Sequence, residues 1–306
     1  MKKTELIDLI HPQNRIVSIV GTVKNAGKTV TMNEIISQAA EKGLTLGLVS
    51  TGRDGERKDV LTETQKPPIY VGRGTIITTV ENVIGSDMAG IEIFKVTDYN
   101  TPMGRVVIGR TRDEGYVEIS GPHSAATIKE MCCEMQNFGA ELVLIDGSLD
   151  RRASAAPYVS DGTILATGAA LARNLNVVID KTMHIINTYS IPQIEKEEIK
   201  DAAASIIDMG RTALLNGDGS IDYIETITSL QSGGAISERL REDTEYIVLS
   251  GSATVDTIKD ILLNKKSSFK IIVKDPTRIF IPSMDYHILQ KMGMELRVVE
   301  NINIIA

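Results

Sequence analysis

The sequence predicts an α/β protein in which a mostly parallel sheet is flanked by helices, with an antiparallel insertion and a second, smaller C-terminal α/β unit. Three observations support this prediction. Short apolar runs that are typical of buried strands alternate with segments of helical periodicity along residues 16–50. The same alternation returns along residues 246–306. Between them, residues 91–120 contain short segments of alternating polarity separated by turn residues, which is the pattern of antiparallel strands.

The composition is that of an ordinary globular protein, because 42% of the 306 residues are hydrophobic and 24% are charged. The net charge is −7 and like charges form no block, which argues against a nucleic-acid-binding surface. The N-terminus lacks the apolar stretch of a secretory signal, and no apolar run is long enough to cross a membrane. Cys132 and Cys133 are adjacent and suit neither a disulfide nor a metal pair. We therefore expect a reduced, cytoplasmic protein that binds neither nucleic acid nor a membrane.

The chain is organised around residues 16–43. An apolar run at 16–20 predicts a buried strand, and apolar residues at 32, 35, 36, 39 and 40 predict a helix that ends near Gly43. Between the two lies the loop Gly-Thr-Val-Lys-Asn-Ala-Gly-Lys-Thr, residues 21–29. A strand, a loop ending in Gly-Lys-Thr and a helix together form the context of a phosphate-binding loop, or P-loop.

Phosphate binding explains the residue types in this loop. Backbone N–H groups at a helix N-terminus attract anions, and Gly27 lets the backbone approach a phosphate closely. Lys28 would reach the β- and γ-phosphate oxygens of a nucleotide and take part in catalysis, while the Thr29 hydroxyl would ligate Mg²⁺. The residues expected to bind the nucleotide are Gly21, Thr22, Lys24, Asn25, Ala26, Gly27, Lys28, Thr29 and Val30.

One position departs from the usual P-loop pattern, G-x-x-x-x-G-K-[ST]. Thr22 occupies the place of the first glycine, and the glycine stands one residue earlier, at Gly21. The alternative interpretation is a Lys-Thr pair that caps an ordinary helix after a glycine-rich turn. The strand before the loop and the amphipathic helix after it favour the phosphate-binding interpretation.

A second parallel strand is predicted at 44–50, directly after the P-loop helix, as a βαβ unit requires. Ligands of open parallel sheets lie outside the carboxyl ends of the strands, so the polar loop 51–57 would share an edge with the phosphates. In this loop Asp54 or Glu56 could hold a metal-bound water, and Asp54 is the catalytic candidate. The alternative is a solvated turn.

A third segment at the same edge is the run 141–147. Four apolar residues end in Asp146, as in a Walker B strand, so Asp146 would act in catalysis and hold Mg²⁺ through a water. The alternative is an aspartate that caps the next turn. After it, Arg151 and Arg152 could stabilise a phosphoryl transition state or form a salt bridge to a partner. Before it, His123 stands at a predicted helix start that Ser124 would cap, and it is either a site residue or a loop histidine.

The rest of the chain predicts further helices and a domain boundary. A helix from Ala169 to about Thr188 carries an apolar stripe that we interpret as core, and residues 193–215 are predicted to form one amphipathic helix followed by a turn. The expected domains are a nucleotide-binding domain at 1–192, a helical connector at 193–245 and a small α/β domain at 246–306.

The loop 21–29 resembles the P-loop of dethiobiotin synthetase and of its relatives, the cobyrinic acid amide synthases and the molybdopterin-guanine-dinucleotide protein B family. Four stretches together resemble a more specific family, the P-loop reactivase subunit of lysine 5,6-aminomutase, which is found beside enzymes of amino-acid fermentation. These stretches are GTVKNAGKT (21–29), STGRDGE (50–56), LVLIDGSLDRR (142–152) and VSDGTILATGAALARN (159–174).

This resemblance implies a chaperone-like ATPase with ATP and Mg²⁺ as ligands. Such a reactivase would couple ATP binding and hydrolysis to the exchange of damaged cobalamin on an adenosylcobalamin-dependent aminomutase. Its partners would be that aminomutase and a second reactivase subunit, and it could form a homodimer. The candidate switch segments are 51–57 and 147–152, because a change at the γ-phosphate can order or release such loops.

Two other functions compete with this one. The first is an ATP-dependent small-molecule ligase or kinase of the dethiobiotin synthetase type, with a substrate pocket built from 51–57 and 121–124. Against it, the Lys-Pro pair of those enzymes is absent at the end of the second strand, because Lys66-Pro67 comes too late. The second is a regulator that binds a nucleotide without turnover. The absence of an N-K-x-D guanine motif favours ATP over GTP.

Overall fold

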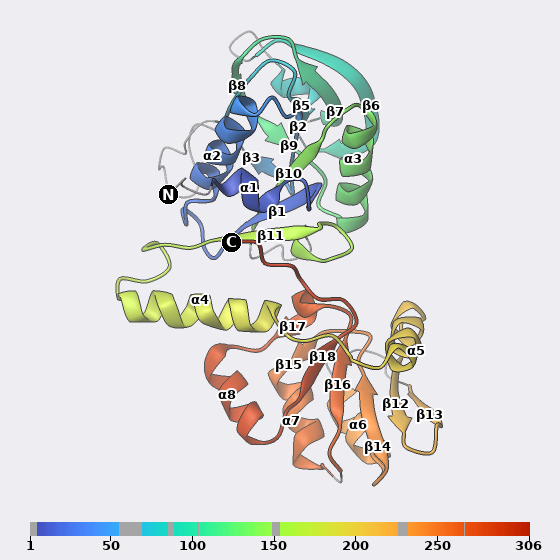
Figure 1. The fold of residues 1–306 in the computed structure, drawn as a ribbon. Coiled ribbons are helices and arrows are strands. Elements are labelled where there is room, and N and C mark those ends of the chain that lie inside the picture. Colours follow the sequence, from blue (N-terminus) through green and yellow to red (C-terminus); the bar gives the residue numbers. More distant parts are fainter. Residues whose placement is uncertain are drawn as a thin grey trace. The chain divides into compact units, whose positions relative to one another are not determined.

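The computed structural model describes residues 5–54, 69–84, 89–102, 104–148, 154–225, 232–265 and 267–306. The chain divides into two compact units (Figure 1). Unit 1 comprises Met1–Thr182 with Asn303–Ala306, and unit 2 comprises Met183–Ile302. In the ranges that the structure describes, every helix is too short or too polar to span a lipid bilayer.

Unit 1 is built on a seven-stranded sheet in the order β11-β1-β10-β2-β5-β7-β6. The strands are β1 (Ile16–Gly21), β2 (Leu46–Ser50), β5 (Ile76–Val80), β6 (Ile91–Thr101), β7 (Gly104–Thr111), β10 (Leu142–Ser148) and β11 (Gly162–Ala166). The five strands from β11 to β5 run parallel, whereas β7 runs antiparallel to both β5 and β6. The structure therefore confirms the mostly parallel sheet and its antiparallel edge.

Helices cover both faces of this sheet. On one face α1 (Leu6–Ile10) and α2 (Lys28–Glu41) pack on a core that includes Ile19, Leu48 and Leu144. On the other face α3 (Ala125–Asn137) packs on a core that includes Val49 and Ile145. Neighbouring residues of one strand thus enter different cores, since successive side chains of a strand point to opposite faces. This explains the apolar runs of the sequence, because a parallel sheet is buried on both sides.

The ends of the helices follow the sequence signals. Gly43 has a φ of 70° directly after the end of α2, a conformation that glycine adopts at little cost. The Ser124 hydroxyl accepts a hydrogen bond of 3.2 Å from the Thr127 N–H and caps α3 as predicted. Short elements complete unit 1: η1 (Glu81–Val83), the antiparallel pair β3 (Arg53–Asp54) and β9 (Ile119–Ser120), and the antiparallel pair β4 (Ile69–Val71) and β8 (Gly115–Val117).

Helix α4 (Leu175–Tyr189) differs from its prediction in two respects. It starts six residues later than Ala169, because the Asn174 side chain accepts a hydrogen bond from the Asn176 N–H (2.9 Å) and the helix begins there. Its apolar stripe is also only partly core, since Val178 and Tyr189 are buried while Leu175, Ile179 and Met183 are exposed. Around the helix axis, the buried side with Val178 and Tyr189 is rotated by about 100°, the angle between successive residues, from the exposed side with Leu175, Ile179 and Met183.

Unit 2 contains a five-stranded mixed sheet in the order β13-β12-β14-β16-β18. The strands are β12 (Thr212–Asn216), β13 (Ile221–Ile224), β14 (Thr244–Val248), β16 (Lys270–Val273) and β18 (Leu296–Val298). Its other elements are α5 (Glu197–Asp208), α6 (Ser232–Arg239), α7 (Val255–Leu263), η4 (Pro276–Arg278), α8 (Ser283–Lys291) and the short parallel pair β15 (Ala253–Thr254) and β17 (Ile279–Phe280). The second, smaller α/β unit is thereby confirmed.

The prediction of one helix over 193–215 is wrong. Helix α5 ends at Asp208, Gly210 adopts a φ of 69°, and Thr212–Asn216 forms the fully buried strand β12. This strand pairs on both sides, with β13 and with β14, and that pairing overrides the helical periodicity of the segment. Because β12, β13 and α6 belong to unit 2, the expected connector at 193–245 is part of the same compact body as 246–306.

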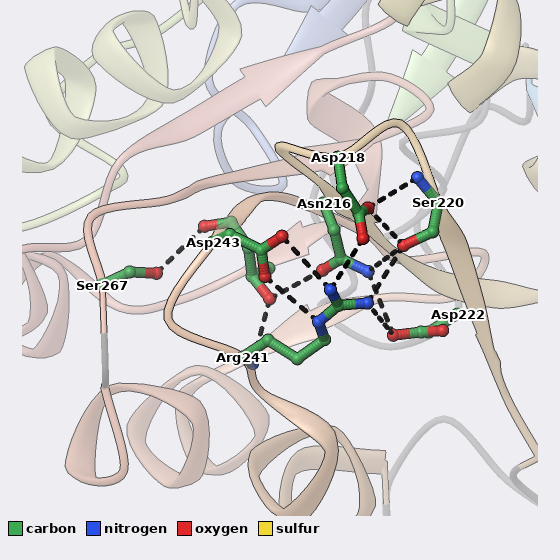
Figure 2. A network of polar contacts seen from close by, with 8 residues as sticks. Asn216, Asp218, Ser220, Asp222, Arg241, Asp243 and Ser267 are labelled. Atoms are coloured by element: carbon green, nitrogen blue, oxygen red, sulfur yellow. Dashed lines mark hydrogen bonds and ion pairs between the residues drawn. The ribbon is translucent and has the colours of Figure 1, made fainter.

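A polar network fixes the turn between β12 and β13, as predicted at residues 216–219 (Figure 2). The Arg241 guanidinium pairs with Asp218 (2.8 Å) and Asp243 (3.1 Å), approaches Asp222 (3.7 Å) and donates to the Ser220 hydroxyl (3.0 Å). The Ser220 hydroxyl and N–H, followed by Arg241, lower the pKa of Asp218 from 3.8 to about 2. The network ties the hairpin to the segment before β14, and the three carboxylates share one cation.

Candidate functional site

The carboxyl ends of four parallel strands meet at one edge of the unit 1 sheet. Gly21 at the end of β1 is level with Ser148 of β10 and with Ala166 of β11. Ser50 at the end of β2 is level with Asp146 of β10, and the Thr51 N–H donates to the Asp146 carbonyl oxygen (3.0 Å). Loops far apart in the sequence therefore share this edge, where ligands of open parallel sheets bind.

The strand order places a topological switch point at this edge. From β1 the chain continues to β2, which lies beyond β10 in the sheet, whereas from β10 it continues to β11, which lies beyond β1. The two connections thus leave neighbouring strands in opposite directions, and the crevice between such connections is the usual ligand site. The loop after β1 is the predicted P-loop, and the residue near the end of β10 is Asp146.

The backbone of the P-loop has the form expected of an anion site. Asn25 (φ 62°) and Gly27 (φ 97°) are both left-handed, and Asn25 is the one residue other than glycine with a positive φ among the described residues. Turns of this kind direct neighbouring backbone N–H groups into a concavity that binds anions. The first intrahelical bond of α2 runs from the Thr31 N–H to the Gly27 oxygen (2.9 Å). The N–H groups before Thr31 therefore point at the loop, with the positive end of the helix dipole.

Lys28 and Asp146 form an ion pair at the centre of this edge. Lys28 is the first residue of α2, and Asp146 lies on β10 opposite Ile19 of β1. The Asp146 side chain is 1% exposed and that of Lys28 is 19% exposed. Since a buried carboxylate is costly unless it is paired, the Lys28 ammonium stabilises the charge of Asp146 in the interior. The structure thus brings together two residues that the sequence assigned to one site.

Two further residues of the predicted site, Thr29 and Val30, follow Lys28 in α2. Thr29 is half-buried in the same first turn of α2, while Val30 is 62% exposed. A hydroxyl and a carboxylate at one edge are hard oxygen ligands of the kind that Mg²⁺ prefers. Over the described ranges, no group of three or more His, Cys, Asp or Glu side chains could hold a metal ion. Magnesium that completes its shell with waters and phosphate oxygens needs no such group, so Thr29 and Asp146 fit it.

The segment after β2 lies against the segment before α3. Asp54 in β3 pairs with Ile119 in β9, the Gly121 N–H donates to the Gly52 oxygen (2.8 Å), and His123 Nδ1 lies 3.1 Å from the Thr51 oxygen. A carbonyl oxygen only accepts, so His123 Nδ1 is the donor in this contact. Thr51 therefore links His123 to Asp146, because its oxygen accepts from His123 and its N–H donates to the Asp146 carbonyl oxygen.

Several expected site residues lie outside the part that the structure describes. The Asp54 side chain is among them, as are Glu56, Arg151, Arg152 and most of the candidate switch segments 51–57 and 147–152. The catalytic role of Asp54 and the switching of these segments stay predictions.

Sequence reasoning missed two glycines that shape the edge. A Cβ atom on Gly121 would lie 2.1 Å from the Ser50 oxygen, and one on Gly147 would lie 2.3 Å from the Ser154 hydroxyl. Both values are far below van der Waals contact. At Gly121 the opposing atom belongs to the backbone, so the backbone would have to shift, whereas at Gly147 the Ser154 side chain would have to move. A glycine directly after a buried strand or before a helix is a local signal of this kind, but the neighbour that requires it is distant in the sequence.

No protein-family model, curated protein or solved structure matches this chain. The fold, the geometry of this edge and the sequence motifs are therefore the features that point to a function.

Proposed function

We propose that unit 1 binds ATP together with Mg²⁺ and hydrolyses the nucleotide at the edge where β1, β2 and β10 end. The observation that carries this proposal is the ion pair between Lys28 and Asp146, formed where the P-loop enters α2. A helix-capping Lys-Thr pair, the competing interpretation of the motif, gives no reason for the lysine to meet a buried aspartate on the neighbouring strand.

Each residue of the site has a definite task in this proposal. The N–H groups around Gly27 and at the start of α2 receive the phosphates, and the Lys28 ammonium neutralises the β- and γ-phosphate oxygens. Thr29 and Asp146 would hold a magnesium ion, Asp146 through a water. When bound, the ion would supply neutralisation of the charge that develops on the phosphates. Asp54 is the further catalytic candidate, as a residue that would hold a metal-bound water.

We further propose that this ATPase is a reactivation factor that helps exchange damaged cobalamin on an adenosylcobalamin-dependent aminomutase, together with a second reactivase subunit. The four stretches that resemble the reactivase family support this role. Gly21 of the first stretch, Ser50 of the second, Asp146 of the third and Ala166 of the fourth lie at one edge of the sheet. Motifs separated by more than a hundred residues thus meet at one sheet edge, which supports a common role for them.

A second candidate function is an ATP-dependent small-molecule ligase or kinase. One observation favours it: the segment at Thr51 and Gly52 lies against Gly121 and His123, which are the places where such an enzyme would build its substrate pocket. With Nδ1 donating to the Thr51 oxygen, Nε2 is the His123 ring atom that would face a substrate.

The test is ATP turnover by the purified protein, alone and with an aminomutase that carries inactivated adenosylcobalamin. The reactivase role predicts stimulated turnover and recovered mutase activity when fresh cofactor is added. ATP binding with neither effect would favour the ligase or kinase, and the next step would be a metabolite screen.

Two lysine variants at opposite ends of α2 separate the site from the scaffold. Lys28→Ala should lower turnover by roughly 100-fold or more, the usual result of removing a donor to the developing charge. Lys42→Ala is the matched control, because Lys42 follows the other end of α2 and pairs with Glu5 (3.2 Å) and Asp8. Its turnover should equal that of the wild type. Unchanged nucleotide affinity and turnover in Lys28→Ala would contradict the proposed site.

A further inference from the structure

We infer that Asp146 makes nucleotide binding by this protein conditional on a divalent cation, because Asp146 and the triphosphate compete for the same Lys28 ammonium. The inference rests on the proposed nucleotide site and adds a regulatory property to it. It predicts that metal-free ATP is excluded by the protein's own carboxylate, and that neutralising this carboxylate opens the site to metal-free ATP.

The geometry sets up the competition. Lys28 forms its ion pair with Asp146 inside the sheet edge, and the carboxylate is almost fully buried (1% exposed). The same lysine is the first residue after Gly27, where the P-loop directs a lysine to the β- and γ-phosphates. The Lys28 ammonium can therefore pair with either of two anions, the Asp146 carboxylate of the protein or the triphosphate of the ligand.

The consequence follows from the cost of breaking a buried ion pair. If the triphosphate draws the Lys28 ammonium away without replacement, the Asp146 carboxylate loses this pair and also faces an incoming anion. Losing one partner of a buried pair commonly changes an equilibrium by a factor of 100 or more, although the 19% exposure of Lys28 moderates the loss. A cation at Asp146 and Thr29 takes over the role of the ammonium and frees Lys28 for the phosphates.

The experiment measures binding, since the readout must not depend on turnover. Isothermal titration calorimetry of the full chain would use the non-hydrolysable β,γ-imido analogue of ATP, with excess Mg²⁺ or with excess EDTA. For the wild type we expect affinity in EDTA to be roughly 100-fold weaker than in Mg²⁺. For Asp146→Asn, affinity in EDTA should be at least about 10-fold stronger than for the wild type in EDTA, and the effect of Mg²⁺ should shrink to about threefold or less.

Three controls separate this competition from a general effect of charge. Asp180→Asn removes one exposed carboxylate of α4 in unit 1 and should leave both affinities unchanged. AMP has no β- or γ-phosphate for Lys28, so Asp146→Asn should leave its affinity in EDTA unchanged. In the double variant Lys28→Ala/Asp146→Asn, the gain in metal-free affinity should disappear, because no ammonium remains to be released. Thermal unfolding of each variant in EDTA verifies that it is folded.

The outcomes distinguish this inference from the proposed function. If Asp146→Asn and the wild type bind the analogue equally in EDTA, the competition does not exist even though the nucleotide site does. The inference also fails if AMP gains as much as the triphosphate, or if the double variant keeps the gain, since a general charge effect would then explain the result. If the folded wild type binds no nucleotide in Mg²⁺, the proposed function fails, and the inference fails with it.

Discussion

Replacing Gly121 with alanine tests how closely the two sides of the candidate site approach each other. Gly121 lies where the chain enters α3, and its N–H donates to the Gly52 oxygen (2.8 Å). A Cβ atom at this position would lie 2.1 Å from the Ser50 oxygen and 3.2 Å from Val49 Cγ2. The closest atom belongs to the backbone of β2, a central strand, so it cannot turn away as a side chain would.

The magnitude follows from the overlap. Adding a methyl group to a packed interior costs about 1–3 kcal/mol, and a backbone neighbour places Gly121→Ala at the upper end, about 3 kcal/mol. For a unit the size of unit 1, each kcal/mol lowers the melting temperature by about 2–4 °C, so a fall of roughly 6–12 °C is expected. Gly121 and His123 hold their segment against Gly52 and Thr51 at the edge of the candidate site. A shift of this segment should therefore also weaken the affinity for Mg²⁺ and ATP.

The assay is thermal unfolding followed by circular dichroism, with Gly72→Ala as the matched control. Among the described residues, a Cβ atom on Gly72 has no neighbour within 4 Å, and its φ lies outside the left-handed region. That variant should melt at the wild-type temperature or slightly above it, since alanine restricts the unfolded chain. If Gly121→Ala melted within about 2 °C of the wild type, the predicted loss of stability of about 3 kcal/mol, and with it the steric overlap at Gly121, would be refuted.

Three further variants test other parts of the structure. Thr22→Gly restores the usual P-loop glycine but should lower unfolding stability in urea by about 1–2 kcal/mol, because Thr22 is 6% exposed and its hydroxyl donates to Thr167 (3.3 Å). Leu214→Ala in the buried strand β12 should destabilise unit 2 by about 2–5 kcal/mol while nucleotide binding by unit 1 persists; an unchanged urea midpoint would contradict the core position of Leu214. Asp218→Asn should make the urea midpoint less dependent on pH between about 4 and 2. The folded pKa of Asp218, about 2, lies below its ordinary 3.8, so its contribution is present above pH 4 and is lost as the pH falls toward 2. Equal slopes for variant and wild type would show that the Ser220 and Arg241 contacts do not hold in solution.

The sequence was most informative where burial is symmetrical. The strands at Ile16–Gly21 and Leu142–Ser148 are mostly apolar, because helices cover both faces of the sheet. It failed at Thr212–Asn216, where a buried strand follows an amphipathic helix after only three residues and its apolar residues continue the helical pattern. What decides that segment is its pairing with β13 and β14, and such contacts are not encoded locally.

The candidate site was predictable as a set of residues and not as an arrangement. Lys28 and Asp146 each belong to a recognisable motif, but their ion pair depends on the register that places Asp146 opposite Ile19. Gly121 and Gly147 were missed for the same reason, because the atoms that exclude a side chain there belong to Ser50 and Ser154. A motif is recognised from the order of neighbouring residues in the sequence. The proposed competition between Asp146 and the triphosphate for Lys28 depends instead on the pairing of β1 with β10.

The departure of the P-loop at Thr22 follows from where the loop turns. The Thr22 N–H donates to the Ala166 oxygen (2.9 Å) and so continues the ladder between β1 and β11, which requires no left-handed conformation. The left-handed residues come later, at Asn25 and Gly27. The position with little room is Gly21, where a Cβ atom would lie 3.3 Å from the Val23 oxygen. The small residue at Gly21 therefore permits the tight turn. The buried Thr22 hydroxyl then bonds the loop to Thr167, the residue that follows β11.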